Sequence, residues 1–457
     1  MVNRAQVEEA EQFLREHPEI GSIDLLIADI NGVIRGKRIS RQTLHKVYKD
    51  GVCLPGSLFA VNIMGETVEE TGLGFDEGDA DRICWPVPGS LRPIPWQPRP
   101  MAQLLLGMYE EDGRPFYADP RHVLTRVAER FTRELRLTPV VAVEMEFYLI
   151  DQARDARGRP QPPLSPKTGE RESKTQVYGV DELDDYTELL EAIAAAAALQ
   201  GIPADTAVAE YAPGQYEINL KHEPDALAAC DHAVMLKRLI KAVALDRRME
   251  ATFMAKLYAD QAGSGMHVHI SLLDEQGRNV FRARDGRDSP ELLAAIGGLL
   301  ELMPESMALF APNANSYRRF QPGAFVPLTP TWGYNNRTTA LRIPAGPEEA
   351  TRIEHRVAGA DANPYLLVAA LLAGMHHGIS RRSDPPPVVT GNAYAQFPRS
   401  LPSTWDAALD AFQRSSVLKE YLGADFCRVY HANKLSERNE FVRYVTPLEL
   451  EWYLRPV

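Results

Sequence analysis

The clearest pattern along the chain is a set of four short segments in which polar and apolar residues alternate. They span residues 143–147, 215–220, 267–271 and 352–356. Side chains two apart in a β-strand share a face, so each segment predicts a strand with glutamate, histidine or arginine side chains on one face. A single strand of this kind could have a solvated outer face. Four of them in one chain predict an antiparallel sheet that lines a polar cavity.

The rest of the pattern predicts a small N-terminal domain followed by a larger helix-rich part. Asn31-Gly32 stands between the apolar runs 23–29 and 33–39, which indicates a hairpin. Residues 86–100 contain six prolines, which disfavour helix and suggest the boundary region of that small domain. Residues 151–174, rich in Pro, Arg, Gly and Asp, predict a long exposed loop. Helical periodicity covers residues 4–16, 182–200, 225–249, 289–303, 362–380 and 404–414.

Composition restricts the classes of function. The chain has 457 residues and a formal net charge of −12, which argues against a general nucleic-acid or membrane-surface binder. Four scattered cysteines without a CxxC pair suit reduced, mostly buried thiols, and the N-terminus lacks the apolar run of a signal peptide. Residues 364–379 are apolar but too short to span a membrane, which predicts a buried core helix. We therefore expect a soluble, cytoplasmic protein.

The residue types on the polar faces indicate phosphoryl-transfer chemistry. Carboxylates that share a face repel one another, and divalent cations resolve that cost. Many carboxylates with one or two histidines and no cysteine favour Mg²⁺ or Mn²⁺ over zinc. Arginine suits phosphate and carboxylate recognition, and five arginines accompany the acids: Arg319, Arg337, Arg342, Arg352 and Arg356. The chain has no GxxxxGK[ST] loop and no third glycine after Gly263-Ser264-Gly265, so the two common nucleotide-binding fingerprints are absent.

Short motifs follow one another along the chain: Asp29-x-Asn31-Gly32, Glu144-x-Glu146, Pro213-Gly214-Gln215-x-Glu217, Gly263-Ser264-Gly265-Met266-His267, Asn336-Arg337 with Arg342-Ile343-Pro344, Arg352-x-Glu354-x-Arg356 and Asn363-Pro364-Tyr365. In their order and approximate spacing they resemble those of the glutamine synthetases, and the resemblance covers essentially the whole chain. The resemblance implies an α+β protein with a β-grasp-like N-terminal domain (residues 1–112). A catalytic domain (residues 113–457) follows, with a curved antiparallel half-barrel sheet flanked by helices. It further implies a homododecamer of two hexameric rings, with active sites between subunits.

The resemblance also implies a role for each matching residue. One metal is expected on Glu146, Glu210 and Glu217, and a second on Glu144, His267 and Glu354. ATP is expected to contact His269, Ser271, Arg337, Arg342 and Arg352. Glutamate is expected at Gly263, Arg319 and Arg356, with Arg356 and Arg337 as the catalytic arginines. The implied reaction converts the glutamate γ-carboxylate and ATP into γ-glutamyl phosphate, which a nitrogen nucleophile then attacks.

Two departures from the family pattern concern the nitrogen substrate. Phe325 stands where glutamine synthetases have a glutamate that closes over ammonium, and Pro55 stands where they have an ammonium-binding aspartate. Both ammonium-directed carboxylates are therefore replaced by apolar side chains, which suit an alkyl or aryl amine. The pattern is similar to that of the γ-glutamylpolyamine synthetases and their monoamine-using relatives. Residues 66–81 add seven acidic and no basic side chains, either as a solvated loop or as a funnel for cationic amines.

We therefore expect an ATP-dependent glutamate–amine ligase active in polyamine or monoamine metabolism. Two alternatives stay open: a glutamine synthetase that uses ammonia, and a non-catalytic structural or sensor protein of the same fold. The sequence leaves undecided which amine is used and which base deprotonates it. Tyr394 lies near a position that is adenylylated in some relatives, but its flanking sequence differs.

Overall fold

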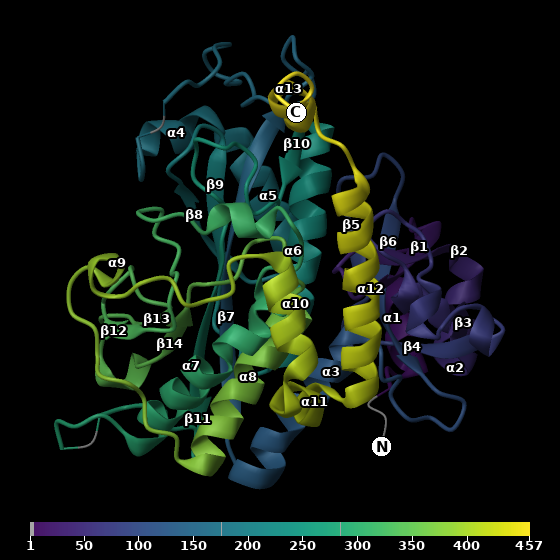
Figure 1. Cartoon of the computed structure of the whole chain (residues 1–457). Coiled ribbons are helices and arrows are strands. Elements are labelled where there is room, and N and C mark those ends of the chain that lie inside the picture. Colours follow the sequence, from purple (N-terminus) through teal and green to yellow (C-terminus); the bar gives the residue numbers. More distant parts are fainter. Residues whose placement is uncertain (1–3, 175, 284) are drawn as a thin grey trace.

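Two β-sheets organise the protein, as a computed structural model of residues 4–174, 176–283 and 285–457 shows (Figure 1). The N-terminal sheet has the order β2-β1-β6-β4-β3, with β5 paired to β6, and β1 and β6 run parallel. Its strands are β1 (Ser22–Ala28), β2 (Ile34–Ser40), β3 (Val52–Pro55), β4 (Asp81–Pro86), β5 (Arg92–Ile94) and β6 (Met101–Tyr109).

The second sheet has the order β12-β13-β14-β11-β7-β9-β8, with β10 paired to β7. Its strands are β7 (Thr138–Asp151), β8 (Ala204–Ala209), β9 (Gln215–Leu220), β10 (Met249–Thr252), β11 (Met266–Leu273), β12 (Trp332–Tyr334), β13 (Leu341–Ile343) and β14 (Ile353–His355). The four segments with alternating polarity form β14, β11, β7 and β9, which are consecutive antiparallel neighbours. The expected α+β class with a curled half-barrel sheet and flanking helices is confirmed (Figure 1).

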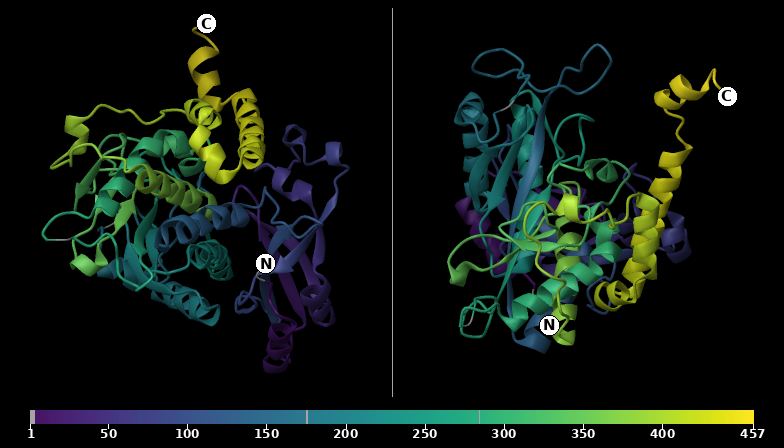
Figure 2. Two further views of the ribbon diagram at one scale, coloured as in Figure 1. Left: turned by 90° about the horizontal axis from the view of Figure 1, so that it is seen from below. Right: turned by 60° about the vertical axis from the view of Figure 1, so that its left-hand side comes forward.

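Helices accompany both sheets: those before residue 51 lie with the N-terminal sheet, and most of the later ones lie with the second sheet (Figure 1). They are α1 (Val7–Glu16), α2 (Leu44–Asp50), α3 (Pro120–Arg130), α4 (Val180–Asp185), α5 (Thr187–Leu199), α6 (Ala226–Asp246), α7 (Pro290–Phe310), α8 (Pro364–Arg381), α9 (Ala393–Gln396), α10 (Trp405–Arg414), α11 (Ser416–Leu422), α12 (Ala424–Arg443) and α13 (Pro447–Tyr453). The last of these, α13, extends away from the body of the fold (Figure 2).

Several element boundaries differ from the sequence prediction. The helix expected over 182–200 is two helices, α4 and α5, because the backbone at Tyr186 leaves the helical region. The helix expected over 289–303 continues to Phe310 through Pro304, and α3 and α12 were not predicted. The proline-rich segment 86–100 does not separate the two sheets, because β5 lies within it and pairs with β6. The chain leaves the N-terminal sheet after Tyr109, so the proposed boundary at 112/113 falls between β6 and α3 and stays a prediction.

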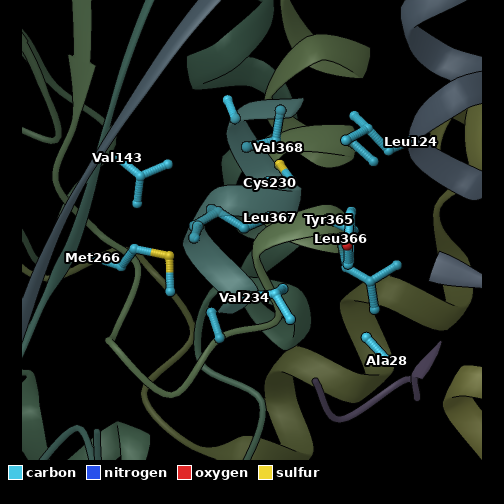
Figure 3. Close-up of a cluster of buried hydrophobic side chains, with 14 of the residues drawn as sticks. Ala28, Leu124, Val143, Cys230, Val234, Met266, Tyr365, Leu366, Leu367 and Val368 are labelled. Atoms are coloured by element: carbon cyan, nitrogen blue, oxygen red, sulfur yellow. The ribbon is translucent and has the colours of Figure 1, made fainter. Parts of the chain in front are cut away.

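The apolar face of the second sheet packs on helices α6 and α8. Val143 of β7 and Met266 of β11 point toward Leu367 of α8 and Val234 of α6 (Figure 3). Val143 is fully buried, while Glu144 beside it lies on the opposite face of β7. Burial of one face on helices therefore leaves the glutamates and histidines of the other face for the site.

Helix α8 begins at the Asn363-Pro364-Tyr365 motif, which has a structural role. The Asn363 side chain accepts a hydrogen bond from the Tyr365 backbone N–H at 3.0 Å, and Pro364 occupies the first helical turn. The same side chain donates to the backbone carbonyl of Asp29 at 3.0 Å, which ties the N-terminal hairpin to the start of α8. Residues 364–378 are buried, as the sequence predicted for a core helix.

Helix α7 is long and apolar enough to cross a membrane by length and composition alone. However, 78% of its apolar window is buried inside the fold, as in the core helix of many globular proteins. Three of the four cysteines are buried and all four are free thiols, which agrees with the expectation of reduced, mostly buried cysteines.

Candidate active site

The polar faces of neighbouring strands bring ionisable side chains opposite one another. On β7, Glu144 lies opposite His267 of β11, and Glu146 lies opposite Glu217 of β9. Directly opposed side chains in an antiparallel pair have Cβ atoms about 4.5–5.5 Å apart, so the register alone forces these groups together. The sheet therefore presents a row of acids and histidines on one face.

Three overlapping groups of potential metal ligands result. In each, the nearest ligand atoms all lie within 4.8 Å of one another: Glu146, Glu210 and Glu217; Glu144, Glu217 and His267; Glu144, His269 and Glu354. His269 Nε2 lies 2.9 Å from a Glu144 oxygen, and His267 Nδ1 lies 3.5 Å from the other. The first group has the membership that the resemblance implies. The expected second set, Glu144, His267 and Glu354, is divided between the other two groups, with His269 joining Glu354.

Two of these carboxylates have a raised pKa because burial and neighbouring acids outweigh the cations near them. Burial raises the pKa of Glu217 to about 9, and the nearby Glu144, Glu146 and Glu210 carboxylates add to that rise. Burial likewise raises the pKa of Glu210 to about 7, with Glu146 contributing. Crowded carboxylates without a counter-charge favour protonation or a bound cation.

Glu354 is in the opposite situation. Its burial favours the neutral acid, but Arg356, the two histidines and Arg342 more than offset this and lower the pKa of Glu354 to about 2. Arg342 Nη1 donates to one carboxylate oxygen at 2.7 Å, and Arg356 donates to the other. The cluster thus changes from acid-rich at β9 to arginine-rich at β14.

The ligand set fits hard divalent cations. Carboxylate oxygens predominate, His267 and His269 supply imidazole nitrogen, and none of the three groups contains a cysteine. Mg²⁺ and Mn²⁺ prefer such oxygen-rich sites, and a cation here would relieve the repulsion that raises the pKa values of Glu210 and Glu217. The residues present therefore fit the metals that the resemblance implies.

The expected nucleotide residues extend along the same face toward β14. Arg352 Nε donates to His269 Nδ1 at 3.1 Å, which fixes the ring that approaches Glu144. Ser271 follows His269 on the same face of β11, and Arg337 Nη1 donates to the Tyr178 hydroxyl at 2.8 Å. These positions leave Arg337 and Arg352 at the edge of the acidic cluster, where an anionic group can reach them.

Arg319 lies beneath the glycine-rich segment. Arg319 as a whole is 3% exposed, and its guanidinium donates from Nη1 to the Val357 carbonyl at 2.8 Å. A Cβ atom on Gly263 would lie 2.7 Å from Arg319 Cγ, and one on Gly265 would lie 2.6 Å from Arg319 Nη2. Glycine at both positions therefore gives Arg319 the space to approach the cluster, which explains why this segment is glycine-rich.

Phe325 lies at the open side of the site with an unusual backbone. Its φ is +51°, in the left-handed region that bulky residues rarely adopt. Its ring lies 6.2 Å from that of Tyr211, centroid to centroid. Val326 is buried next to it, and its carbonyl accepts a hydrogen bond from the Tyr394 hydroxyl at 2.9 Å. This bond links Tyr394 to the residue after Phe325 and engages the Tyr394 hydroxyl within the chain.

Pro55 is the one expected site residue that a single chain keeps apart from the cluster. It lies at the end of β3, paired with Asp81 of β4, in the N-terminal sheet (Figure 1). The acidic segment 66–81 lies beside it, and part of its charge is used internally, since Glu77 pairs with Arg82 at 2.6 Å. Fewer carboxylates of this segment are therefore free to attract a cationic amine than the sequence suggested.

Sequence reasoning missed three residues near the site. Tyr178 and Tyr211 lie outside the periodic segments, so no pattern distinguished them. Asp361 accepts hydrogen bonds from Ser316 at 2.6 Å and Asn313 at 2.8 Å, which tie the Arg319 segment to the loop before α8.

Comparison with known proteins agrees with this geometry. The family described as "Glutamine synthetase, catalytic domain" matches residues 117–453. The chain belongs to the glutamine synthetase family. It is 49% identical over 451 residues to gamma-glutamylputrescine synthetase PuuA of Escherichia coli (strain K12), covering 99% of this chain and 95% of that protein. It is 31% identical over 463 residues to glutamate–isopropylamine ligase of a Pseudomonas species, covering 99% and 98%.

Among solved structures, a GmaS–ADP complex superimposes with a TM-score of 0.84 at 29% identity, covering 97% of this chain and 98% of the other. Members of the glutamine synthetase family are ATP-dependent carbon–nitrogen ligases, and this protein is one of them.

Proposed function

We propose that this glutamine synthetase family ligase joins L-glutamate, through its γ-carboxylate, to an alkylamine rather than to ammonia. The observation that carries the proposal is the combination of a complete acid, histidine and arginine cluster with an aromatic side chain, Phe325, at its open side. The relatives named for ligation of glutamate to putrescine and isopropylamine support the same conclusion.

The residues divide the work along the sheet. Glu146, Glu210 and Glu217 would hold one Mg²⁺ or Mn²⁺, and Glu144, Glu354 and the two histidines a second. Such metals neutralise phosphate charge during phosphoryl transfer. Arg337, Arg342 and Arg352 supply guanidinium groups for the ATP phosphates, with His269 and Ser271 beside them. Arg319 and Gly263 serve glutamate.

The reaction has two balanced steps. A γ-carboxylate oxygen of glutamate attacks the terminal phosphorus of ATP, the bond to ADP breaks, and γ-glutamyl phosphate forms. The unprotonated amine then attacks the γ-carbonyl carbon, phosphate leaves, and the amine nitrogen releases a proton. Arg356, which donates to Glu354 in the cluster, steadies the γ-carboxylate and the transferring phosphoryl group, and Arg337 assists at the phosphate.

The acceptor side requires a second copy of the chain. Pro55 lies on the N-terminal sheet, away from the cluster of its own chain, so a neighbouring subunit must supply it if it lines the amine site. A ring of subunits with sites between them, as in the two-ring dodecamer that the family resemblance implies, meets this requirement.

The decisive assay measures phosphate release with glutamate, Mg-ATP and a panel of putrescine, ethanolamine, isopropylamine and ammonia. We expect the highest kcat/KM with one of the organic amines. Ammonia as the best substrate would instead make the protein a glutamine synthetase. No turnover with any nitrogen donor, from protein that binds metal and ATP, would indicate a non-catalytic member of the family.

Substitution of Phe325 tests the observation that carries the proposal. In Phe325→Glu, the carboxylate replaces an apolar surface with an acceptor for ammonium, so amine kcat/KM should fall about 10-fold or more and ammonia use should rise. Phe325→Leu keeps an apolar side chain and should lose less. Unchanged amine kinetics in Phe325→Glu would remove Phe325 from the acceptor site.

A further inference from the structure

Tyr211 and Phe325 form an exposed aromatic pair beside the acidic cluster. Their ring centroids are 6.2 Å apart with an interplanar angle of 31°. Tyr211 is 52% exposed and Phe325 is 46% exposed, although large apolar side chains usually bury more of their surface. The pair therefore presents aromatic surface to solvent at the position where a substrate could cover it.

The chain places Tyr211 directly next to the chemistry. It follows Glu210, whose carboxylate lies within 4.8 Å of Glu146 and Glu217, and its own backbone N–H hydrogen-bonds to the Glu210 carboxylate. The aromatic ring therefore belongs to Tyr211, the residue directly after a glutamate of the acidic cluster. A molecule that rests on Tyr211 lies at the margin of the carboxylate cluster.

The chain also maintains Phe325 in a costly conformation. A bulky residue in the left-handed region is strained, and such strain persists where the surrounding structure enforces it, often at functional sites. Here the enforcement comes from both sides: Gly323 takes φ +78°, and Val326 is buried and hydrogen-bonded to Tyr394. With Val326 buried, the Phe325 ring is turned outward against Tyr211.

We propose that Tyr211 is the second wall of the acceptor site, and that the Tyr211–Phe325 pair selects primary amines that carry an alkyl chain. This inference rests on the proposed glutamate–amine ligase activity. An alkylammonium ion has a charge, which favours the face of an aromatic ring, and a methylene stem, which gains from apolar surface. Ammonia offers no stem, so the pair favours it least. Tyr211 acts on specificity through contact with the amine and takes no part in phosphoryl transfer.

The test compares the KM for butylamine, methylamine and ammonia in the full-length protein and three variants. Tyr211→Ala removes the ring and should raise the KM for butylamine about 10-fold or more, and that for methylamine less than about 3-fold. Tyr211→Leu keeps apolar area without an aromatic face and should fall between Ala and wild type. Tyr211→Phe is the matched control, because it keeps the ring and loses only the hydroxyl, and its amine KM should stay within about twofold of wild type.

The KM values for glutamate and ATP separate a specificity role from a structural one. They should change less than about twofold in all three variants. An equal rise in the KM for glutamate and for butylamine, or a loss of thermal stability without any change in amine KM, would overturn the proposal. In the double variant Tyr211→Ala/Phe325→Ala, the increase should be smaller than the product of the two single increases, since both rings contact one stem. Fully multiplicative increases would contradict a shared contact.

The failure of this inference is distinguishable from failure of the proposed function. If the wild-type protein turns over no amine, the proposed activity itself is wrong. If the wild type uses amines and Tyr211→Ala shows the wild-type dependence on chain length, the activity stands and only the role of Tyr211 is wrong.

Discussion

Buried carboxylates occur in both sheets, but their surroundings differ. In the N-terminal sheet, Asp29 is fully buried and accepts hydrogen bonds from the backbone N–H groups of Asn31 and Val33, each at 2.9 Å, and from Arg35 Nε at 2.6 Å. In the catalytic sheet, Glu146 and Glu217 face each other with Glu210 close by.

This difference separates structural acids from functional ones. Burial raises the pKa of Asp29 as well, but its own chain supplies Arg35 and two backbone N–H groups as partners, so this carboxylate needs no ligand. Carboxylates that crowd together without enough cations of their own destabilise the fold until a cation arrives, and they mark the site where a metal belongs. The crowded carboxylates of the second sheet therefore lower the stability of the metal-free fold and at the same time form a site that can bind cations.

The largest effect should follow from removing a carboxylate of the crowded cluster in the second sheet. Glu217 belongs to two of the three ligand groups, so Glu217→Gln should lower phosphate release by more than about 1,000-fold through loss of metal. Mn²⁺ stoichiometry, measured by electron paramagnetic resonance, should fall in parallel. Wild-type Mn²⁺ stoichiometry in this variant would exclude Glu217 as a ligand. Its thermal stability in EDTA should match or exceed that of wild type, because glutamine has no carboxyl group that burial and crowding force to stay protonated in the folded state.

For Asp29, which is paired with Arg35 in the N-terminal sheet, we expect a loss of stability instead of a loss of activity. Asp29→Asn keeps the shape of the side chain but removes the charge that Arg35 neutralises, so the unfolding free energy should fall by about 2–3 kcal/mol. Chemical denaturation followed by circular dichroism measures this change. Asp112→Asn is the matched control, since its pair with Arg114 is exposed and should not affect stability measurably. A stable Asp29→Asn protein would mean that the hairpin does not depend on this charge.

The sequence could predict the polar faces because strand periodicity is local. The two-residue alternation around Glu144 and Glu146 is visible without knowing what lies beside them. It could not predict the register, because the pairing of Glu146 with Glu217 joins residues 71 positions apart through the sheet order. For that reason, the expected metal-ligand set came from the family resemblance and not from the strand pattern.

The same limit explains the residues that sequence reasoning missed or misplaced. Tyr211 follows Glu210 in the chain, but only the fold brings Phe325 against it. The proline-rich segment 86–100 suggested a domain boundary by composition, whereas β5 joins the N-terminal sheet through backbone hydrogen bonds that Pro93 does not interrupt. Composition indicates local stiffness, and tertiary pairing decides where a segment belongs.

The smallest predicted effect, counted per pH unit, concerns the pH dependence of the unfolding free energy of the metal-free protein. The pKa of Glu217 is raised to about 9 in the folded state, above the ordinary value of about 4.3 for the unfolded chain, so the folded state holds the extra proton between these values. Stability from this group is complete below the unfolded pKa and is lost as the pH rises toward 9. The unfolding free energy in EDTA should therefore fall with rising pH, by at most about 1.4 kcal/mol per pH unit for this one proton.

Two comparisons isolate the contribution of Glu217 to that slope. Glu217→Gln in EDTA lacks the titrating group. The difference in unfolding free energy between wild type and this variant should therefore become smaller as the pH is lowered from 9 to 5. Saturating Mn²⁺ should flatten the wild-type slope, because a bound cation replaces the proton as the counter-charge. A difference in unfolding free energy that stays constant over this pH range would show that Glu217 is already ionised in the metal-free protein. The arginines near β14 would then neutralise the acidic row more completely than the distances suggest.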